Sequence, residues 1–250
     1  MISNRLIQHM KNAGRVAVLT GAGVSAESGV PTFRGEDGLW KKFRPEELAS
    51  IDAFMANPEL VWEWYSARRQ IVREKKPNPG HMALAEMESI FREFTLITQN
   101  VDGFHQRAGS RNVLELHGNI LFSKCIRCGA KSDRVEFSIE RRIPLCPCGG
   151  QMRPDVVWFG EALPQDVLVQ AFEASKHCDV FFSIGTSAVV HPAASLPLAA
   201  KQAGALIVEI NTERTALSDF ADEMIIGKSG EVLPELVEQL KTGEMASEQI

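Results

Sequence analysis

Apolar residues gather in short runs along this chain, and longer stretches with helical spacing separate most of them. β-branched residues and phenylalanine dominate the runs, with little alternation between apolar and polar positions, as expected of strands covered on both faces. The runs are Arg15–Thr20, Phe94–Thr98, Val113–Leu116, Asp179–Ile184, Ala205–Ile210 and Met224–Ile226. Helical spacing marks the stretches Met82–Phe91, Gln165–Lys176, Pro192–Ala203 and Glu231–Lys241. This alternation predicts an α/β fold built on a Rossmann-like, doubly wound parallel sheet.

Two stretches break the alternation and predict a smaller inserted domain. Residues 35–76 are rich in charged and aromatic residues and show helical spacing, so we expect a helical module there. Residues 121–158 contain four of the five cysteines, with turn residues and little helical period, which indicates a second, ribbon-like module. The remaining segments, 1–34, 77–120 and 159–250, would then form the sheet domain.

Composition and charge narrow the class of protein. The chain has 250 residues, of which 44% are hydrophobic and 24% charged, as is ordinary for a globular protein. The net charge of −5 gives no electrostatic reason to expect direct binding of nucleic acid. No apolar run approaches the roughly 20 residues of a membrane span, and the polar N-terminal segment predicts a helix rather than a secretory signal. We therefore expect a cytoplasmic protein without membrane partners, whose cysteines serve metal or redox chemistry before disulfides.

A glycine-rich loop follows the first predicted strand directly. Gly21, Ala22 and Gly23 open the next helix, which suits a pyrophosphate, because glycine lets the backbone approach the ligand and helix N–H groups favour negative charge. The spacing departs from the usual dinucleotide fingerprint, since the third glycine comes late and no acidic residue is placed to hold a ribose. A tight turn without a ligand therefore stays an alternative. The loop 31–40 carries an arginine and aromatic residues that suit a lid over an anionic, ring-bearing ligand.

Polar side chains follow two further predicted strands at their carboxyl ends, where open parallel sheets bind ligands. Gln99, Asn100 and Asp102 come after the second strand, and their amides and carboxylate can hydrogen-bond ribose hydroxyls and a carboxamide. For Asp102 the alternative is that it caps the next helix. His117 follows the third strand, and histidine suits general-base work near neutral pH. We assign no chemistry to the other histidines.

The cysteines form two closely spaced pairs on glycine-rich turns. Cys125 and Cys128 make the first pair, and Cys146 and Cys148 make the second, with an unusually tight single residue between them. Four thiolates in this pattern predict a zinc site with no open coordination position, so the zinc would be structural rather than catalytic. Two disulfides are the alternative. Cys178, beside a predicted strand, is expected to be a buried apolar-like residue.

These features together resemble the sirtuin family, the NAD-dependent protein deacylases. The matching motifs occur in the family's order along nearly the whole chain: Gly21–Ser25, Ser28–Gly35, Thr98–Asp102, Leu116–Gly118, the two cysteine pairs, Val156–Glu161 and Ile184–Ser187. Each motif is weak alone, whereas the ordered set is specific. The resemblance implies a Rossmann-like domain and a small domain of helices and a zinc ribbon, with NAD and an acyl-lysine peptide in the cleft between them.

The resemblance also implies roles for individual residues. His117 and Asn100 would be catalytic. The substrate peptide would pair as an added strand with Val156, Val157, Trp158 and Phe159, through main-chain bonds that tolerate many sequences. The NAD site would comprise Gly21, Ala22, Gly23, Ala26, Phe33, Arg34, Trp40, Gln99, Asn100, Val101, Asp102, Gly185, Thr186, Ser187, Asn211, Thr212, Glu213 and Ser229.

In the implied reaction, NAD is consumed. The acyl oxygen of the modified lysine attacks C1′ of the NAD ribose as nicotinamide leaves, in a pocket that aligns the reactants and excludes water. His117 takes a proton from a ribose hydroxyl, which attacks the bound imidate carbon. Water then releases free lysine and O-acyl-ADP-ribose.

A pair of residues on the helix after Pro58 indicates which acyl group is bound. Tyr65 and Arg68 share one helical face with apolar residues, and an arginine on such a stripe needs an anionic partner. The pair resembles the sirtuin subgroup that removes succinyl and malonyl groups, in which it binds the acyl carboxylate. The alternative is an arginine that reaches solvent over a core helix. Acetyl-lysine is still acceptable in this interpretation.

Three other functions fit parts of the pattern. An NAD-dependent protein mono-ADP-ribosyltransferase would share the fold, the co-substrate and His117, but it needs no carboxylate pocket at Tyr65 and Arg68. A zinc-ribbon module for nucleic acid conflicts with the negative charge and the polar strand ends. A dehydrogenase conflicts with the glycine spacing and the missing acidic residue.

Overall fold

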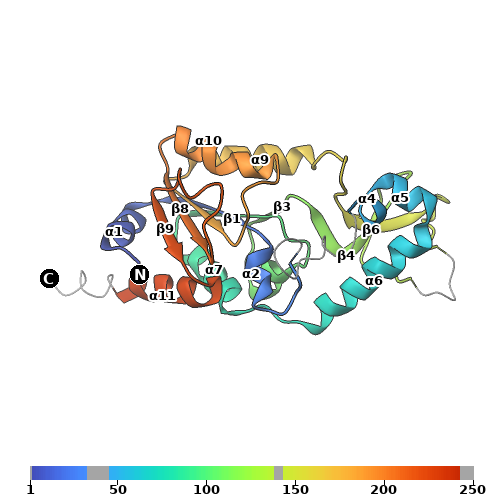
Figure 1. Cartoon of the computed structure of the whole chain (residues 1–250), viewed down its shortest axis with the longest axis horizontal. Coiled ribbons are helices and arrows are strands. Elements are labelled where there is room, and N and C mark those ends of the chain that lie inside the picture. The colour runs from blue at the N-terminus through green and yellow to red at the C-terminus, as the bar shows by residue number, and fades with distance from the viewer. Residues whose placement is uncertain (1, 33–44, 138–142, 243–250) are drawn as a thin grey trace.

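A computed structural model of the protein describes residues 2–32, 45–137 and 143–242. Within these residues the larger sheet has six parallel strands in the order β3-β2-β1-β7-β8-β9 (Figure 1). The strands are β1 (Arg15–Thr20), β2 (Glu93–Thr98), β3 (Val113–Glu115), β7 (Val180–Ile184), β8 (Leu206–Asn211) and β9 (Glu223–Ile226). The strand order reverses between β1 and β7, and such a switch point is where doubly wound sheets bind ligands.

This architecture confirms the predicted α/β fold with a doubly wound parallel sheet. Each predicted run forms a strand whose ends differ from the prediction by at most one residue. The stretch predicted as one helix over 192–203 instead forms a 3₁₀ turn, η1 (Ala193–Ser195), followed by α10 (Leu196–Gln202). A continuous α-helix would require the N–H of Pro197 to reach the carbonyl of Ala193, and proline has no N–H.

Helices cover both faces of the sheet, and neighbouring residues of each strand point into opposite cores. Residues such as Val18 contact one core, which α1 (Asn4–Asn12), α7 (Pro79–Ile90) and α11 (Ser229–Thr242) complete. Residues such as Leu19 contact the other core, which α9 (Gln165–His177) and α10 complete. Burial on both faces explains why the strands lack an alternating polar pattern.

The smaller domain combines a short antiparallel sheet with helices, at the opposite end of the molecule from α1 (Figure 1). Its sheet has the order β5-β4-β6, and its helices precede the first strand in sequence. The elements are α4 (Pro45–Leu48), α5 (Ile51–Ala56), α6 (Pro58–Glu74), β4 (Gly118–Cys125), β5 (Lys131–Ser132) and β6 (Met152–Val156). Strand β4 spans the boundary that the sequence suggested at 120/121, so the assignment of ranges to domains stays a proposal.

Helix α6 is fixed at its start and along its buried face. The Asn57 side chain accepts a hydrogen bond from the N–H of Leu60, and Pro58 occupies the first turn, where it needs no N–H partner. Arg69 is buried, yet it donates to the carbonyls of Ile120 and Phe122 on β4. A buried guanidinium with these partners holds the helix against the strand.

Within the described residues, no helix is both long and apolar enough to cross a lipid bilayer.

Candidate active site

A cavity of about 860 Å³ opens where the carboxyl ends of β1, β2, β7 and β8 face the small domain. Its wall combines the glycine-rich loop, the strand ends, helix α6 and the segment after β6. Most of the site residues expected from the sequence line it: Gly21, Ala22, Gly23, Ala26, Tyr65, Arg68, Gln99, Asn100, Val101, His117, Val156, Val157, Trp158, Phe159, Gly185, Thr186, Ser187, Asn211, Thr212, Glu213 and Ser229. Phe33, Arg34 and Trp40 lie outside the described residues.

The glycines of the loop are required by a neighbouring turn of the backbone. A Cβ atom on Gly21 would lie 2.7 Å from the carbonyl oxygen of Gly185, and one on Gly23 would lie 2.8 Å from its Cα. Gly185 itself has a φ of +59°, and a Cβ there would lie 2.6 Å from the nitrogen of Val24. The helix α2 (Ala22–Ala26) that follows has only five residues. The sequence attributed these glycines to ligand approach, whereas packing of two turns already requires them.

Amides at the strand ends join the same two turns across the sheet. Nε2 of Gln99 donates to Oγ1 of Thr186 over 2.8 Å, and Nδ2 of Asn100 donates to the carbonyl of Gly21 over 3.0 Å. Nδ2 of Asn211 donates to the carbonyl of Thr186. These bonds hold the cavity floor in place, and they use amide protons that the sequence left free for a ligand.

Asp102 does not line the cavity but lies beneath it, 5% exposed. Its Oδ2 accepts from the hydroxyl of Ser25 at 2.7 Å, and its Oδ1 accepts from the N–H of Phe104, the first residue of α8 (Phe104–Ala108). Burial raises the pKa of this carboxyl against the opposing effect of those bonds. Asp102 thus meets the helix start as the capping alternative expected, although Gly103 is the N-cap residue; a contact with NAD stays a prediction.

His117 projects from the turn between β3 and β4, half-buried at the cavity wall. Its Nδ1 lies 2.9 Å from the carbonyl oxygen of Gln99, and since a carbonyl only accepts, Nδ1 is the protonated nitrogen. Burial lowers the pKa of His117, with the bond to Gln99 acting in the opposite sense. At neutral pH the ring is therefore uncharged, and Nε2 carries the lone pair that a general base needs.

Gly118 makes the turn after His117 possible. Its φ is +76°, and a Cβ there would lie 2.2 Å from the carbonyl oxygen of Asp155. Gly118 pairs with Val156, and the N–H of Val157 donates to the carbonyl of His117 over 2.9 Å. The position of His117 is therefore fixed where the chain enters and leaves the small sheet.

The small-domain wall of the cavity contains the Tyr65–Arg68 pair. Tyr65 is 3% and Arg68 9% exposed, so Arg68 does not reach out to solvent as the alternative supposed. The guanidinium of Arg68 lies 4.8 Å from the centre of the Trp64 ring. Burial lowers the pKa of Arg68 to about 10, with Tyr65 and Asp102 acting in the opposite sense, so the group is a cation at neutral pH. A positive charge and a phenol thus share one partly apolar wall.

The segment expected to pair with a peptide already has its donors engaged. The N–H groups of Val157, Trp158 and Phe159 donate to the carbonyl of His117, the carboxylate of Glu161 and the carbonyl of Ala49, respectively. A peptide that adds a strand here must either exchange one of these bonds or donate to the segment's carbonyl oxygens alone.

Known proteins share this arrangement over most of the chain. The sequence profile of the Sir2 family matches residues 21–192, from the glycine loop past the Gly185 turn. A protein of Pyrococcus furiosus named "NAD-dependent protein deacylase" is 53% identical over 228 residues, which are 89% of this chain and 91% of that protein. The chain belongs to the Sir2 family.

Solved Sir2 structures superimpose on nearly the whole chain. A crystal structure of a Sir2 homolog–NAD complex matches with a TM-score of 0.91 and 48% identity, covering 97% of this chain and 95% of that one. A Sir2–p53 peptide–NAD⁺ complex matches with a TM-score of 0.83 and 32% identity, covering 98% and 100%. These comparisons confirm the expected Sir2-family enzyme fold and do not favour the ADP-ribosyltransferase alternative, since the relatives are named as deacylases.

The four cysteines of the Sir2 small domain converge as the sequence predicted. The Sγ atoms of Cys125, Cys128, Cys146 and Cys148 all lie within 4.8 Å of one another, with Cys125 and Cys148 3.5 Å apart and Cys128 and Cys146 3.7 Å apart. Tetrahedral zinc with Zn–S bonds of about 2.3 Å separates its sulfurs by about 3.8 Å. The donor set therefore fits one structural zinc ion, and a Cβ on Gly150, 2.6 Å from the Cys125 sulfur, would crowd it. Cys178 is buried, as expected.

Several cavity residues of this Sir2 chain were given no individual role by the sequence, although Glu27 and Thr32 fall in the stretch from the glycine loop to Trp40 that was expected to line the site. The full set is Glu27, Thr32, Ala49, Trp64, Gly160, Glu161, Leu163, Val190, His191, Ile210, Arg214, Thr215, Gly227 and Lys228. Glu27 accepts hydrogen bonds from the hydroxyl of Ser229 and the N–H of Gly230, and so ties α2 to the start of α11. The sequence offered one signal for Glu27, which is its position in the glycine-rich loop. Its hydrogen-bond partners, however, lie some 200 positions away in the sequence.

Proposed function

We propose that this Sir2-family chain is an NAD-dependent protein-lysine deacylase that removes succinyl and malonyl groups as well as acetyl groups. The observation that supports the acyl preference is the position of Tyr65 and Arg68 in the wall of the same cavity as His117. The relatives named above support NAD-dependent deacylation itself. The substrates are acylated lysines of proteins or peptides, and the Sir2 structure above that holds a p53 peptide together with NAD⁺ supports a peptide substrate.

The charge of the pocket favours an acidic acyl group. Arg68 is buried and cationic, and a buried cation is stabilised by an anion that reaches it through a charge-assisted bond. A succinyl or malonyl group ends in a carboxylate, whereas an acetyl group ends in a methyl. An acetyl-lysine can enter the same cavity but offers Arg68 nothing to bind.

The sheet side of the cavity would hold NAD. The turns at Gly21 and Gly185 and the amides of Gln99 and Asn211 line this side. When bound, NAD supplies an electrophilic ribose carbon with nicotinamide as the leaving group. The Nε2 lone pair of His117 accepts a proton from a ribose hydroxyl, and the bond from Nδ1 to the Gln99 carbonyl supports the positive charge that then develops on the ring.

A panel of one peptide carrying acetyl-, succinyl- or malonyl-lysine, assayed with and without NAD, tests the proposal. Arg68→Met is expected to lower kcat/KM for the succinyl peptide roughly 10- to 100-fold more than for the acetyl peptide, because it removes a charge-assisted bond. Arg73→Met, on the exposed part of the same helix, removes only a surface ion pair with Glu136 and should leave the ratio unchanged.

An equal loss of both activities in Arg68→Met would contradict the acyl preference. Mass spectrometry of the succinyl peptide after reaction separates the remaining alternative. Deacylation removes the acyl mass, whereas transfer of ADP-ribose adds mass to the peptide.

A further inference from the structure

The hydroxyl of Tyr65 is hydrogen-bonded to an indole from a distant part of the chain. Nε1 of Trp158 lies 2.8 Å from the Tyr65 oxygen, with both side chains buried and both lining the cavity. An indole N–H can only donate, so the Tyr65 oxygen is the acceptor. The orientation of this phenol is therefore set by a residue 93 positions away.

Accepting this bond leaves the hydroxyl proton of Tyr65 to point elsewhere. In the part of the chain that the structure describes, the bond from Trp158 is the only hydrogen bond of this hydroxyl. Burial raises the pKa of Tyr65 to about 12, although the bond from Trp158 acts against the rise. The hydroxyl thus keeps its proton at neutral pH. Arg68, its neighbour on the helix, carries only donors and cannot accept that proton.

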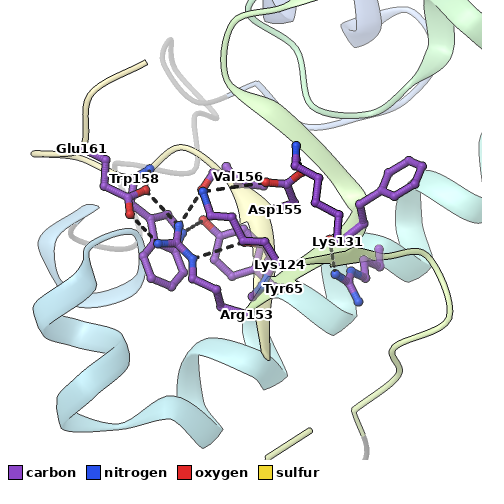
Figure 2. Close-up of polar contacts among 11 residues, drawn as sticks. Tyr65, Lys124, Lys131, Arg153, Asp155, Val156, Trp158 and Glu161 are labelled. Atoms are coloured by element: carbon purple, nitrogen blue, oxygen red, sulfur yellow. Dashed lines mark hydrogen bonds and ion pairs between the residues drawn. The ribbon is translucent and has the colours of Figure 1, made fainter. Parts of the chain in front are cut away.

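Trp158 is itself held by an ion pair between the buried Arg153 and the partly exposed Glu161 (Figure 2). Cζ of Arg153 lies 3.2 Å from the centre of the Trp158 ring, and Arg153 is 2% exposed. The guanidinium donates to both carboxylate oxygens of Glu161, and Glu161 also accepts from the backbone N–H of Trp158 at 2.8 Å. Burial opposes ionisation of Glu161, but these bonds outweigh it and lower the pKa of the carboxyl. The indole therefore has little freedom to turn away from Tyr65.

We propose that Trp158 is a specificity-determining residue that acts by positioning Tyr65. Its indole N–H occupies the acceptor side of the Tyr65 hydroxyl, which directs the hydroxyl proton to the carboxylate of a succinyl or malonyl group in the cavity. Arg153 and Glu161 hold the indole in that orientation. This inference rests on the proposed function, because an acetyl group has no carboxylate for Tyr65 to meet.

The test compares Trp158→Phe with the wild-type protein on acetyl and succinyl forms of one peptide. The variant keeps an aromatic ring but loses the N–H donor. We expect the ratio of succinyl to acetyl kcat/KM to fall roughly 3- to 10-fold, the effect of one hydrogen bond. The ratio cancels any common loss in peptide binding. In a Tyr65→Phe background, Trp158→Phe should not change the ratio further, because its only target is gone.

Trp62→Phe is the matched control. Trp62 lies in the same core and donates its indole N–H to the carbonyl of Met152, not to Tyr65. It should lower the melting temperature without changing the ratio. If Trp158→Phe does not fold, Glu161→Gln replaces it, since weakening the pair with Arg153 should lower the ratio in the same sense.

A spectroscopic readout follows Tyr65 directly. It is the only tyrosine in the sequence, so labelling tyrosine with ¹³C at Cζ gives one resonance from this phenol. The succinyl peptide should shift that resonance more than the acetyl peptide does, and Trp158→Phe should reduce the difference.

Two outcomes overturn the inference, and they are distinguishable. If Tyr65→Phe and Arg68→Met both leave the ratio unchanged, the proposed acyl preference fails and the positioning role fails with it. If those variants lower the ratio while Trp158→Phe and Glu161→Gln do not, the acyl preference stands and only the positioning role is wrong.

Discussion

The two walls of the cavity differ in what forms their surface, which is mainly backbone on the sheet side and mainly side chains on the small-domain side. On the sheet side, backbone packs on backbone, and Gly21, Gly23 and Gly185 leave no room for a Cβ. On the small-domain side, large side chains make the surface, with Tyr65 and Trp158 hydrogen-bonded to each other. The shape of the sheet wall thus requires glycine at three positions. The shape of the small-domain wall requires large side chains whose orientation is fixed by a hydrogen bond.

This difference separates two tasks. Backbone turns and strand-end amides give a surface that suits a ligand common to the whole family. Rings and guanidinium groups on the other wall give a surface that a few substitutions can change. His117 lies between the walls, at the turn from β3 to β4, and would act on a ribose whichever acyl group is present.

The largest effect is expected from His117→Ala, which tests whether His117 is needed for both acetyl and succinyl substrates. Turnover should fall by about 10²- to 10⁴-fold for acetyl and succinyl peptides alike, because a general base contributes a factor of this order. NAD affinity, measured by calorimetry, should change far less. Near-normal deacylation by this variant would remove His117 from the mechanism.

Gly185→Ala tests the sheet wall alone. The new Cβ would meet the nitrogen of Val24 at 2.6 Å, and the φ of +59° adds backbone strain. We expect a loss of about 2 kcal/mol or more in stability, seen as a lower melting temperature, together with weaker NAD binding.

Gly204→Ala provides the control for that substitution. Gly204 also has a positive φ, of +95°, but a Cβ there meets nothing within 4 Å. A φ of +95° lies further from the left-handed region that other residues adopt than +59° does, so backbone strain alone predicts the larger loss of stability in Gly204→Ala. A loss in Gly185→Ala smaller than that in Gly204→Ala would show that the packing of turn on turn contributes little.

The smallest effect is a displacement of the acid limb of the pH–rate profile. The ordinary pKa of histidine is about 6.5, and burial lowers that of His117. The neutral base therefore persists below pH 6.5, and kcat/KM should fall only at more acidic pH, tenfold per unit beyond the folded pKa. Acetyl and succinyl peptides should share this limb. A limb at or above pH 6.5 would show that the ring is not buried as described.

The sequence predicted the sheet well because its strands are buried on both faces, so each forms a short, uninterrupted apolar run such as Arg15–Thr20. It also placed His117 at a strand end and brought the four cysteines together. The contacts that it could not predict are those between distant segments. Trp158 and Tyr65 are 93 positions apart, and nothing local to either residue indicates that their polar atoms meet.

Asp102 and the loop glycines show a second limit. Both were interpreted through a ligand, because glycine and aspartate at strand ends are typical of nucleotide sites. In the structure Asp102 accepts from Ser25 and Phe104 below the cavity, and the glycines pack against Gly185. A residue of the type and position expected for ligand binding can therefore be required by contacts within the fold itself.

The pairing of Gly118 with Val156 has a consequence for how such a protein can evolve. The segment between these two residues leaves the larger domain and returns to it at adjacent points. The bond from the N–H of Val157 to the carbonyl of His117 joins its two ends. An insertion whose two ends lie together imposes little strain on its host, and each doubling of its length adds only about 0.6 kcal/mol of closure entropy. The segment that carries the four cysteines can thus be exchanged, shortened or extended between lineages while His117, which precedes its first residue, keeps its place.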